Sequence, residues 1–253
     1  MRKGAVLVVA LLSLAACRTE EASNSTPQPE VTIAAAANLT DVFQRVGARF
    51  EQTTGIHPVF SFASTAQLAQ QIENGAPFDV FAAADAQHVE ELDRKGLLLS
   101  GSRAVYARGI LALWIPPHSQ ARIDRIEDLA KTDVRFIAIA KPELAPYGEA
   151  AVETLQRLNL WQRIQGKIVY AENINMARQY GMSNNADAVF TAYSLVLHAA
   201  GRTIVVDQAL HPPIEQELGI MATSKHPASA HKFADFLLHG EGRDMLRNSG
   251  YAL

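Results

Sequence analysis

Short apolar runs along this chain are each followed by a segment whose apolar residues recur every three or four positions. The first pattern predicts buried strands and the second predicts amphipathic helices. We expect strands beginning at Val31 and over His57–Ala63, Phe78–Ala84, Gly109–Ile115, Val134–Ala140, Lys167–Ala171, Ala188–Ala192, Thr203–Val206 and Leu218–Thr223. We expect helices over Leu39–Phe50, Ala66–Glu73, Ala86–Leu92, Tyr147–Leu158, from about Ile174, and over Ala230–Leu237. Strands that alternate with helices imply an α/β fold, with parallel sheets covered by helices on both faces.

Two segments near the start of the predicted α/β region contain no Lys or Arg and share one pattern. Val31–Phe43 and Val59–Ile72 each run from a strand through small residues into a helix. A helix start offers unpaired N–H groups and the positive end of the helix dipole, so it binds an anion without a cationic side chain. Asn38, Ser64 and Thr65 stand where side-chain donors would supplement these groups. Each is also an ordinary helix cap, but two such starts in one domain favour a ligand site.

The second half of the chain repeats the arrangement. The loop Lys141–Gly148 and the loop Glu172–Asn175 each follow a predicted strand and lead into a helix. Ligands of open α/β sheets lie outside the carboxyl ends of the strands. We therefore expect four helix starts to converge on one cleft between two lobes.

The N-terminus is typical of an export signal. Arg2 and Lys3 precede an apolar stretch over residues 5–16 that is too short to span a bilayer, and Cys17 follows it directly. Leu14-Ala15-Ala16-Cys17 resembles the lipobox of bacterial lipoproteins, which implies lipidation of Cys17 and a lipid anchor in the membrane. The alternative is an ordinary secretory peptide with an incidental cysteine. We assign residues 1–16 to the signal peptide and the polar residues 17–30 to the lipidated N-terminus and a flexible tether. Either alternative places the protein in the periplasm or cell envelope.

Composition narrows the possible functions. The net charge of −3 over 253 residues gives no indication of a nucleic-acid partner. Cys17 is the sole cysteine, so neither a disulfide framework nor a cysteine metal site is expected. An exported hydrolase would need a nucleophile elbow, a metal motif or paired acids, and the eight histidines lack zinc-ligand spacing. Asp79 and Asp85 are the best carboxylate pair, but we expect them to bound a buried strand and to cap the next helix.

Taken in order, six segments resemble the molybdate-binding proteins of bacterial ABC uptake transporters. They are Ala34–Thr40, Phe62–Ala69, Gly75–Asp85, Pro142–Gly148, Ala171–Ile174 and Asn185–Phe190. The resemblance implies a type II periplasmic-binding-protein fold, with two α/β lobes joined by two crossing strands and the ligand in the cleft. Lobe 1 would comprise residues 31–108 and 217–253, and lobe 2 residues 109–216. The crossings are expected near Arg108–Leu111 and Glu215–Gly219.

The resemblance also implies an oxyanion held by neutral donors alone. Carried over residue by residue, the donors are Asn38, Thr65 with Ser64 beside it, the Tyr147 hydroxyl and the Ile174 backbone N–H. Some members add a tyrosine at the position that is Ala192 here, with Tyr193 next to it. That ligand is not carried over, and Tyr147 would supply the missing hydroxyl.

Ligand chemistry favours molybdate, a fully deprotonated tetrahedral dianion that only accepts hydrogen bonds. Phosphate carries a proton at neutral pH and would need an acceptor. Tungstate is nearly the same size as molybdate and is expected to bind too. The alternatives are another anion such as sulfate and, less favoured, the exported hydrolase. We expect a monomer with no catalytic activity and no cofactor, which delivers its cargo to a transporter permease coupled to an ATPase.

Overall fold

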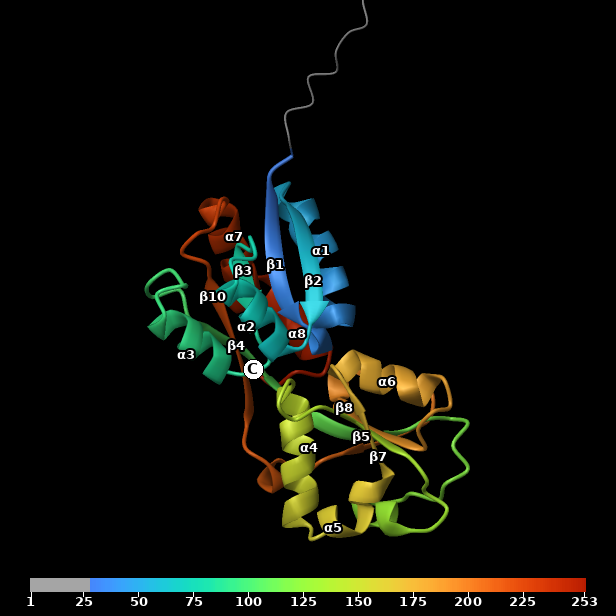
Figure 1. Ribbon diagram of the computed structural model, residues 1–253. Helices are drawn as coiled ribbons and strands as arrows, with labels where there is room; N and C mark the ends of the chain where they lie inside the picture. Colours follow the sequence, from blue (N-terminus) through green and yellow to red (C-terminus); the bar gives the residue numbers. More distant parts are fainter. Residues whose placement is uncertain (1–27) are drawn as a thin grey trace, which may run out of the picture.

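The computed structural model describes residues 28–253 and forms two lobes, one above the other, each built on one five-stranded sheet (Figure 1). The predicted signal peptide, Cys17 and most of the tether lie outside the described residues. None of the helices in residues 28–253 is long and apolar enough to cross a membrane.

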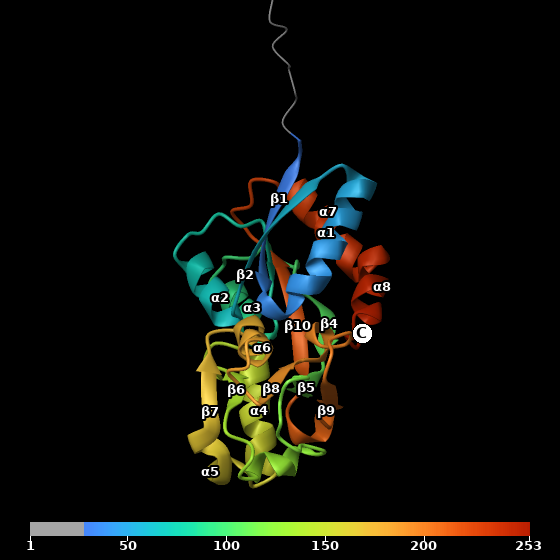
Figure 2. The same ribbon diagram turned by 90° about the vertical axis from the view of Figure 1, so that its right-hand side faces the viewer.

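Lobe 1 has the strand order β2-β1-β3-β10-β4. Strands β1, β2 and β3 are parallel, and β10 runs antiparallel to both β3 and β4. The strands are β1 (Glu30–Ala36), β2 (His57–Ala63), β3 (Val80–Ala82), β4 (Ala104–Gly109) and β10 (Ile214–Ile220). The helices are η1 (Ala37–Leu39), α1 (Thr40–Thr54), α2 (Thr65–Glu73), α3 (Gln87–Arg94), α7 (Pro227–Leu238) and α8 (Glu241–Asn248). Helices α2 and α3 cover one face of the sheet, and α1, α7 and α8 cover the other (Figures 1 and 2).

Lobe 2 has the strand order β7-β6-β8-β5-β9. Its strands are β5 (Leu111–Ile115), β6 (Ile137–Ala140), β7 (Ile168–Ala171), β8 (Ala188–Ala192) and β9 (Arg202–Val205). Its helices are η2 (Ile126–Ala130), α4 (Pro146–Arg157), α5 (Trp161–Ile164), η3 (Gln165–Lys167), α6 (Ile174–Met182), η4 (Tyr193–Leu195) and η5 (Gln208–Leu210). Helix α6 packs on one face over β6 and β8, while α4 packs on the other. The expected α/β architecture with two lobes is therefore present.

The chain crosses between the lobes where β4 gives way to β5. Only Ile110 separates the two strands, so the expected crossing near Arg108–Leu111 is confirmed. The second expectation, a return crossing at Glu215–Gly219, is wrong. Strand β10 is already paired with β4 from Ile214 onward, so the chain returns earlier, over residues 206–213. The C-terminus also lies at this junction, where Ala252 bridges to Arg108 (Figures 1 and 2).

Among the elements missed from the sequence, strand β4 and helix α8 have a weak apolar signal. Strand β4 exposes Val105 and Arg108, which breaks the alternation expected of a strand. Helix α8 has the sequence EGRDMLRN, with only Met245 and Leu246 apolar. Tertiary contacts hold both elements in place: β4 pairs with β10, and α8 packs against α1.

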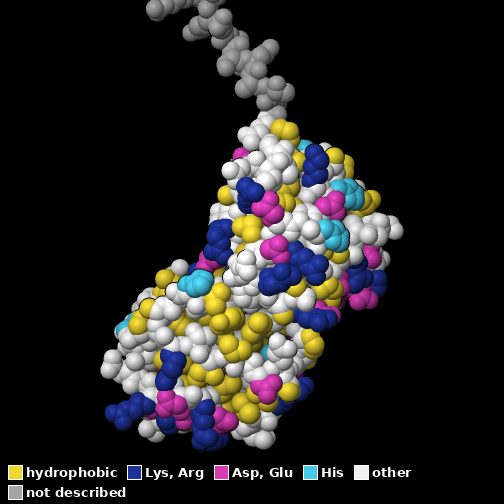
Figure 3. Space-filling view, turned by 180° about the vertical axis from the view of Figure 1, so that it is seen from behind, with side chains coloured by type: hydrophobic (Ala, Val, Ile, Leu, Met, Phe, Trp, Pro, Cys, Tyr) yellow, Lys and Arg dark blue, Asp and Glu magenta, His cyan; other side chains and the backbone are white. Residues whose placement is uncertain are grey.

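Seen from behind, lobe 1 carries basic and acidic side chains close together, while apolar side chains gather across lobe 2 (Figure 3). This mixture of signs agrees with the small net charge of −3.

Inside lobe 1, the buried carboxylate of Asp79 joins three segments of the fold. Asp79 accepts hydrogen bonds from the Thr32 backbone N–H at 2.8 Å, the Ser224 hydroxyl at 2.7 Å and the His226 backbone N–H at 3.2 Å. It therefore ties β1 to the start of α7.

The charged form of Asp79 is the stable one. Burial by itself would raise the pKa of Asp79, but the hydrogen bonds from Thr32, Ser224 and His226 outweigh it and lower the pKa to about 2. Because the folded-state pKa lies below the ordinary value of 3.8, the carboxylate stabilises the fold above about pH 4. This stability is lost as the pH falls through the range from about 4 to about 2.

We predict that Asp79→Asn lowers the free energy of unfolding by about 2 kcal/mol at pH 7, since each pKa unit corresponds to about 1.4 kcal/mol. The difference should shrink as the pH is lowered toward 2. Urea denaturation at several pH values measures both effects. Asp235→Asn, an exposed change on α7, should leave stability unaltered. An Asp79→Asn protein as stable as the unaltered chain at pH 7 would contradict the assignment.

Candidate functional site

The starts of α1, α2, α4 and α6 meet at the junction of the two lobes. The Ala66 N–H at the start of α2 donates to the Leu144 carbonyl before α4, at 3.3 Å. The next residue along α2, Gln67, reaches Glu172 before α6 at 3.5 Å. Helix α6 also contacts η1, which leads into α1. The expected convergence of four helix starts is thus present.

All five predicted ligand residues lie in this buried region. Asn38, Ser64, Thr65, Tyr147 and Ile174 are each no more than 3% exposed. Three of them come from lobe 1 and two from lobe 2. A ligand held among them would be enclosed and would contact both lobes.

Asn38 uses its side chain within the protein. Its Nδ2 donates to Gln216 Oε1 at 3.0 Å and to the Tyr251 hydroxyl at 3.2 Å, and its carbonyl accepts from the Tyr251 hydroxyl at 2.8 Å. Both amide hydrogens are therefore engaged, contrary to the expectation of a side-chain donor free for the ligand. The donors left at this helix start are backbone N–H groups, because the first N–H groups of a helix lack partners inside it.

Ser64 and Thr65 have different environments. Ser64 is the N-cap of α2 in a capping box with Gln67, and its hydroxyl donates to Gln67 Oε1 at 2.7 Å. Ser64 therefore has the capping role that the sequence left as an alternative. The Thr65 hydroxyl accepts from the Ala84 N–H at 3.1 Å, and we find no hydrogen bond that it donates among residues 28–253. This hydroxyl keeps a proton available for an anion.

Tyr147 offers the corresponding hydroxyl from lobe 2. It accepts a hydrogen bond from Gln216 Nε2 at 2.9 Å, which leaves its own proton available. Burial raises the pKa of Tyr147 well above its usual value of 10, and the charge of nearby Tyr251 would raise it further. The hydroxyl therefore stays protonated, and a hydrogen-bond donor, throughout the physiological pH range.

Ile174 is the first residue of α6, and its contribution is confined to the backbone. Asn173 before it caps the helix by accepting from the Met176 N–H at 2.9 Å. Tyr193, whose role the sequence left open, lies beside the C-terminal segment: a Cβ built on Gly250 would come within 3.0 Å of its ring. Ala192 is fully buried and has no donor side chain.

Gln216 is a buried polar residue of this region that was not predicted from the sequence. It is fully buried on β10, where its side chain joins Asn38, Tyr106 and Tyr147. The Tyr106 hydroxyl lies 3.0 Å from Gln216 Oε1 and 2.8 Å from the Ala83 carbonyl. A signal for Gln216 was available, because it shares the buried side of the strand with Ile214 and Leu218. A polar side chain on the buried face of a strand needs hydrogen-bond partners there.

The crossing strand leaves room for this cluster. A Cβ on Gly109 would lie 2.3 Å from the Tyr147 hydroxyl oxygen and 2.8 Å from Gln216 Nε2. Only glycine permits the side chains from both lobes to meet over the crossing.

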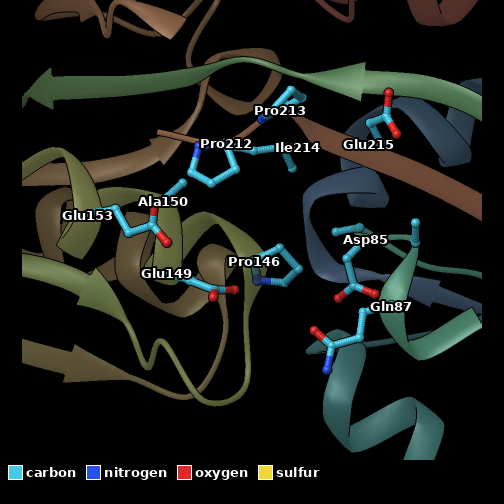
Figure 4. A pocket seen from close by; sticks show the side chains of 12 residues that line it. Asp85, Gln87, Pro146, Glu149, Ala150, Glu153, Pro212, Pro213, Ile214 and Glu215 are labelled. Carbon is cyan, nitrogen blue, oxygen red and sulfur yellow. The ribbon is translucent and has the colours of Figure 1, made fainter. Parts of the chain in front are cut away.

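A neighbouring pocket between the lobes is acidic, whereas the predicted ligand residues are uncharged. This cavity of about 350 Å³ lies between α4, the start of α3 and the return crossing (Figure 4). Four carboxylates line it: Asp85, Glu149, Glu153 and Glu215. Burial raises the pKa of Glu149, and the charges of Glu153 and Asp85 raise it further. These like charges disfavour an anion here, so the enclosed helix starts are the better oxyanion site.

We predict that Gln216→Leu lowers the free energy of unfolding by about 3 kcal/mol, because an unpaired buried polar group costs about 1–3 kcal/mol and three partners lose their bonds. Thermal and urea unfolding measure the change. Gln70→Leu, an exposed change on α2, is the matched control and should cost little. Equal stability of the two variants would show that the Gln216 cluster does not hold the junction together.

Comparison with known proteins agrees with this geometry. Residues 31–252 match a family model described as "Bacterial extracellular solute-binding protein". The molybdate-binding protein ModA of Rhodobacter capsulatus is 36% identical over 223 residues, covering 88% of each chain. ModA of Azotobacter vinelandii is 35% identical over 256 residues, covering 98% of this chain and 97% of the relative.

Structural comparison extends the likeness to the arrangement of the lobes. The periplasmic molybdate-binding protein of Azotobacter vinelandii superimposes with a TM-score of 0.83 and 31% identity, covering 88% of this chain and 99% of that one. These matches confirm the resemblance seen in the sequence and the type II periplasmic-binding-protein fold. The chain belongs to the bacterial extracellular solute-binding proteins.

Proposed function

We propose that this protein captures molybdate, and tungstate equally well, and delivers it to an ABC importer. The observation that carries the proposal is the meeting of four helix starts in a buried region whose five predicted ligand residues are all uncharged. Relatives that are 35–36% identical over most of the chain are named molybdate-binding proteins. The same comparison supports a binding role rather than an enzymatic one.

The proposed ligand contacts are backbone N–H groups at Asn38 and Ile174 and hydroxyl protons of Thr65 and Tyr147. Ser64 shapes the start of α2 through its cap, and Asn38 fixes the start of α1 through Gln216 and Tyr251. A dianion that only accepts hydrogen bonds satisfies every one of these donors. Hydrogen bonds to a charged group contribute about 1.5–3 kcal/mol each, so several together give tight binding without a salt bridge.

Delivery requires the site to open and close. The donors come from both lobes, so only a closed arrangement satisfies them together, and the ligand favours closure through this difference. The crossing segments at Ile110 and over residues 206–213 are the places where the lobes would pivot. We further propose export as a monomer, anchorage through a lipidated Cys17 and delivery to a permease coupled to an ATPase.

Removing one available hydroxyl proton should weaken binding. We predict that Thr65→Val and Tyr147→Phe each reduce oxyanion affinity by about 1–3 kcal/mol, the cost of leaving a buried polar partner unpaired. Calorimetric titration with molybdate measures the change. The controls are Thr53→Val and Tyr170→Phe, which remove hydroxyls of exposed residues that are not among the predicted ligands. Unchanged affinity in both site variants would remove these two hydroxyls from the ligand contacts.

Selectivity tests the proposed ligand directly. Molybdate and tungstate should compete at similar concentrations. Sulfate should compete poorly, because its shorter bonds leave donors on opposite lobes too far apart to bind it together. Phosphate should also compete poorly, since its proton would face a donor and cost about 1–3 kcal/mol. Displacement of molybdate by a similar concentration of sulfate would instead favour a general oxyanion carrier. The absence of binding to any of the four would reject the proposal.

A further inference from the structure

One ion pair crosses the cleft beside the proposed site. Arg178 on α6 of lobe 2 lies with its NH1 2.6 Å from Asp41 Oδ2 on α1 of lobe 1. The second guanidinium nitrogen, NH2, lies 3.4 Å from Asp41 Oδ1, so both carboxylate oxygens face the arginine. The Arg178 side chain is 16% exposed and that of Asp41 is 41% exposed. The pair is thus partly withdrawn from water.

Both members of the pair stand about one helical turn from a predicted ligand donor. Asp41 is the acidic residue in the first turn of α1 and follows Asn38 by three positions. Arg178 follows Ile174, the first residue of α6, by four positions. A carboxylate at a helix start is stabilised by the helix dipole. It therefore competes with a bound anion for the same positive field.

The arginine is held in place by its own lobe. Its NH1 also donates to the Leu195 carbonyl at 2.8 Å, and Leu195 belongs to lobe 2. Separating the lobes would therefore carry Arg178 away from Asp41 while preserving its contact with Leu195. Asp41 has no comparable partner inside lobe 1 among the hydrogen bonds of residues 28–253.

We propose that Arg178 is a closure-dependent counterion, which neutralises Asp41 only when the lobes close around the oxyanion. This inference rests on the proposed function. In the open state water surrounds Asp41 and screens its charge. Closure removes part of the water around Asp41, whose side chain is still 41% exposed in the pair, and so strengthens the repulsion between Asp41 and a dianion. Arrival of Arg178 at the same moment cancels that repulsion and links tight binding to full closure.

The test is calorimetric titration of the full chain with molybdate and with tungstate in four variants. Arg178→Gln leaves Asp41 unpaired and should weaken binding about tenfold, within the usual range of coupling between sites. Asp41→Asn removes the repulsion along with the pair and should change affinity less than about threefold. The double variant should recover to within about threefold of the unaltered protein. Arg49→Gln is the matched control, because Arg49 also lies on α1 but pairs with Glu241 within lobe 1, at 2.6 Å.

Salt provides a second measurement that a merely structural role would not alter. Sodium chloride should recover part of the affinity lost in Arg178→Gln, since it screens the unpaired carboxylate, and should have less effect on the double variant. Equal binding by Arg178→Gln and Arg49→Gln would overturn the inference. So would a double variant as weak as Arg178→Gln, or equal losses in both single variants, which would make the pair a simple tie between lobes. In these cases the unaltered protein still binds and the proposed function stands. Absence of binding by the unaltered protein would overturn both.

Discussion

The hydrogen-bond cluster around Gln216 connects the starts of two of the four helices that form the proposed site, one from each lobe. Through its amide, β10 contacts Asn38 at the start of α1 and Tyr147 at the start of α4. The hydroxyl of Tyr251 completes the cluster from the C-terminal segment. Each member is buried, so each bond must form or leave an unpaired polar group at considerable cost. The cluster therefore fixes the directions from which the starts of α1 and α4 approach each other, and its tyrosine rings pack in the main apolar core.

The second constraint on the proposed site is that its ligand residues carry no charge. The five predicted ligand residues are uncharged, while the adjoining pocket carries four carboxylates and the edge of the site carries the Asp41–Arg178 pair. A cationic site would hold an unpaired charge whenever it was empty and closed, at a large desolvation cost. Helix starts and hydroxyl groups avoid that cost, and they still attract an anion through oriented dipoles. Charge is present in this cleft outside the enclosed region, where Glu215 pairs with Arg108 and Asp41 pairs with Arg178.

Small residues make the close approach possible. The run Ala34–Ala37 ends β1 and begins η1 with side chains that fill little space. Gly109 on the first crossing leaves room for the Tyr147 hydroxyl and the Gln216 amide. These positions allow backbone N–H groups and side chains from both lobes to reach one small volume, which larger residues would occupy themselves.

The sequence by itself determined the alternation of strands and helices, the α/β class, the first crossing and the positions of the four helix starts. Each of these depends on local periodicity, small residues and caps, which are properties of neighbouring positions. Tertiary structure decided where the second crossing lies, since pairing with β4 draws Ile214 into the lobe 1 sheet. It also decided that the Asn38 amide and the Ser64 hydroxyl bond within the protein, while Thr65 and Tyr147 keep protons available. The contacts of Gln216 and the Asp41–Arg178 pair could not be predicted from the sequence, because the residues that they join lie between 69 and 178 positions apart along the chain. Such contacts exist only once the chain has folded and brought these distant segments together.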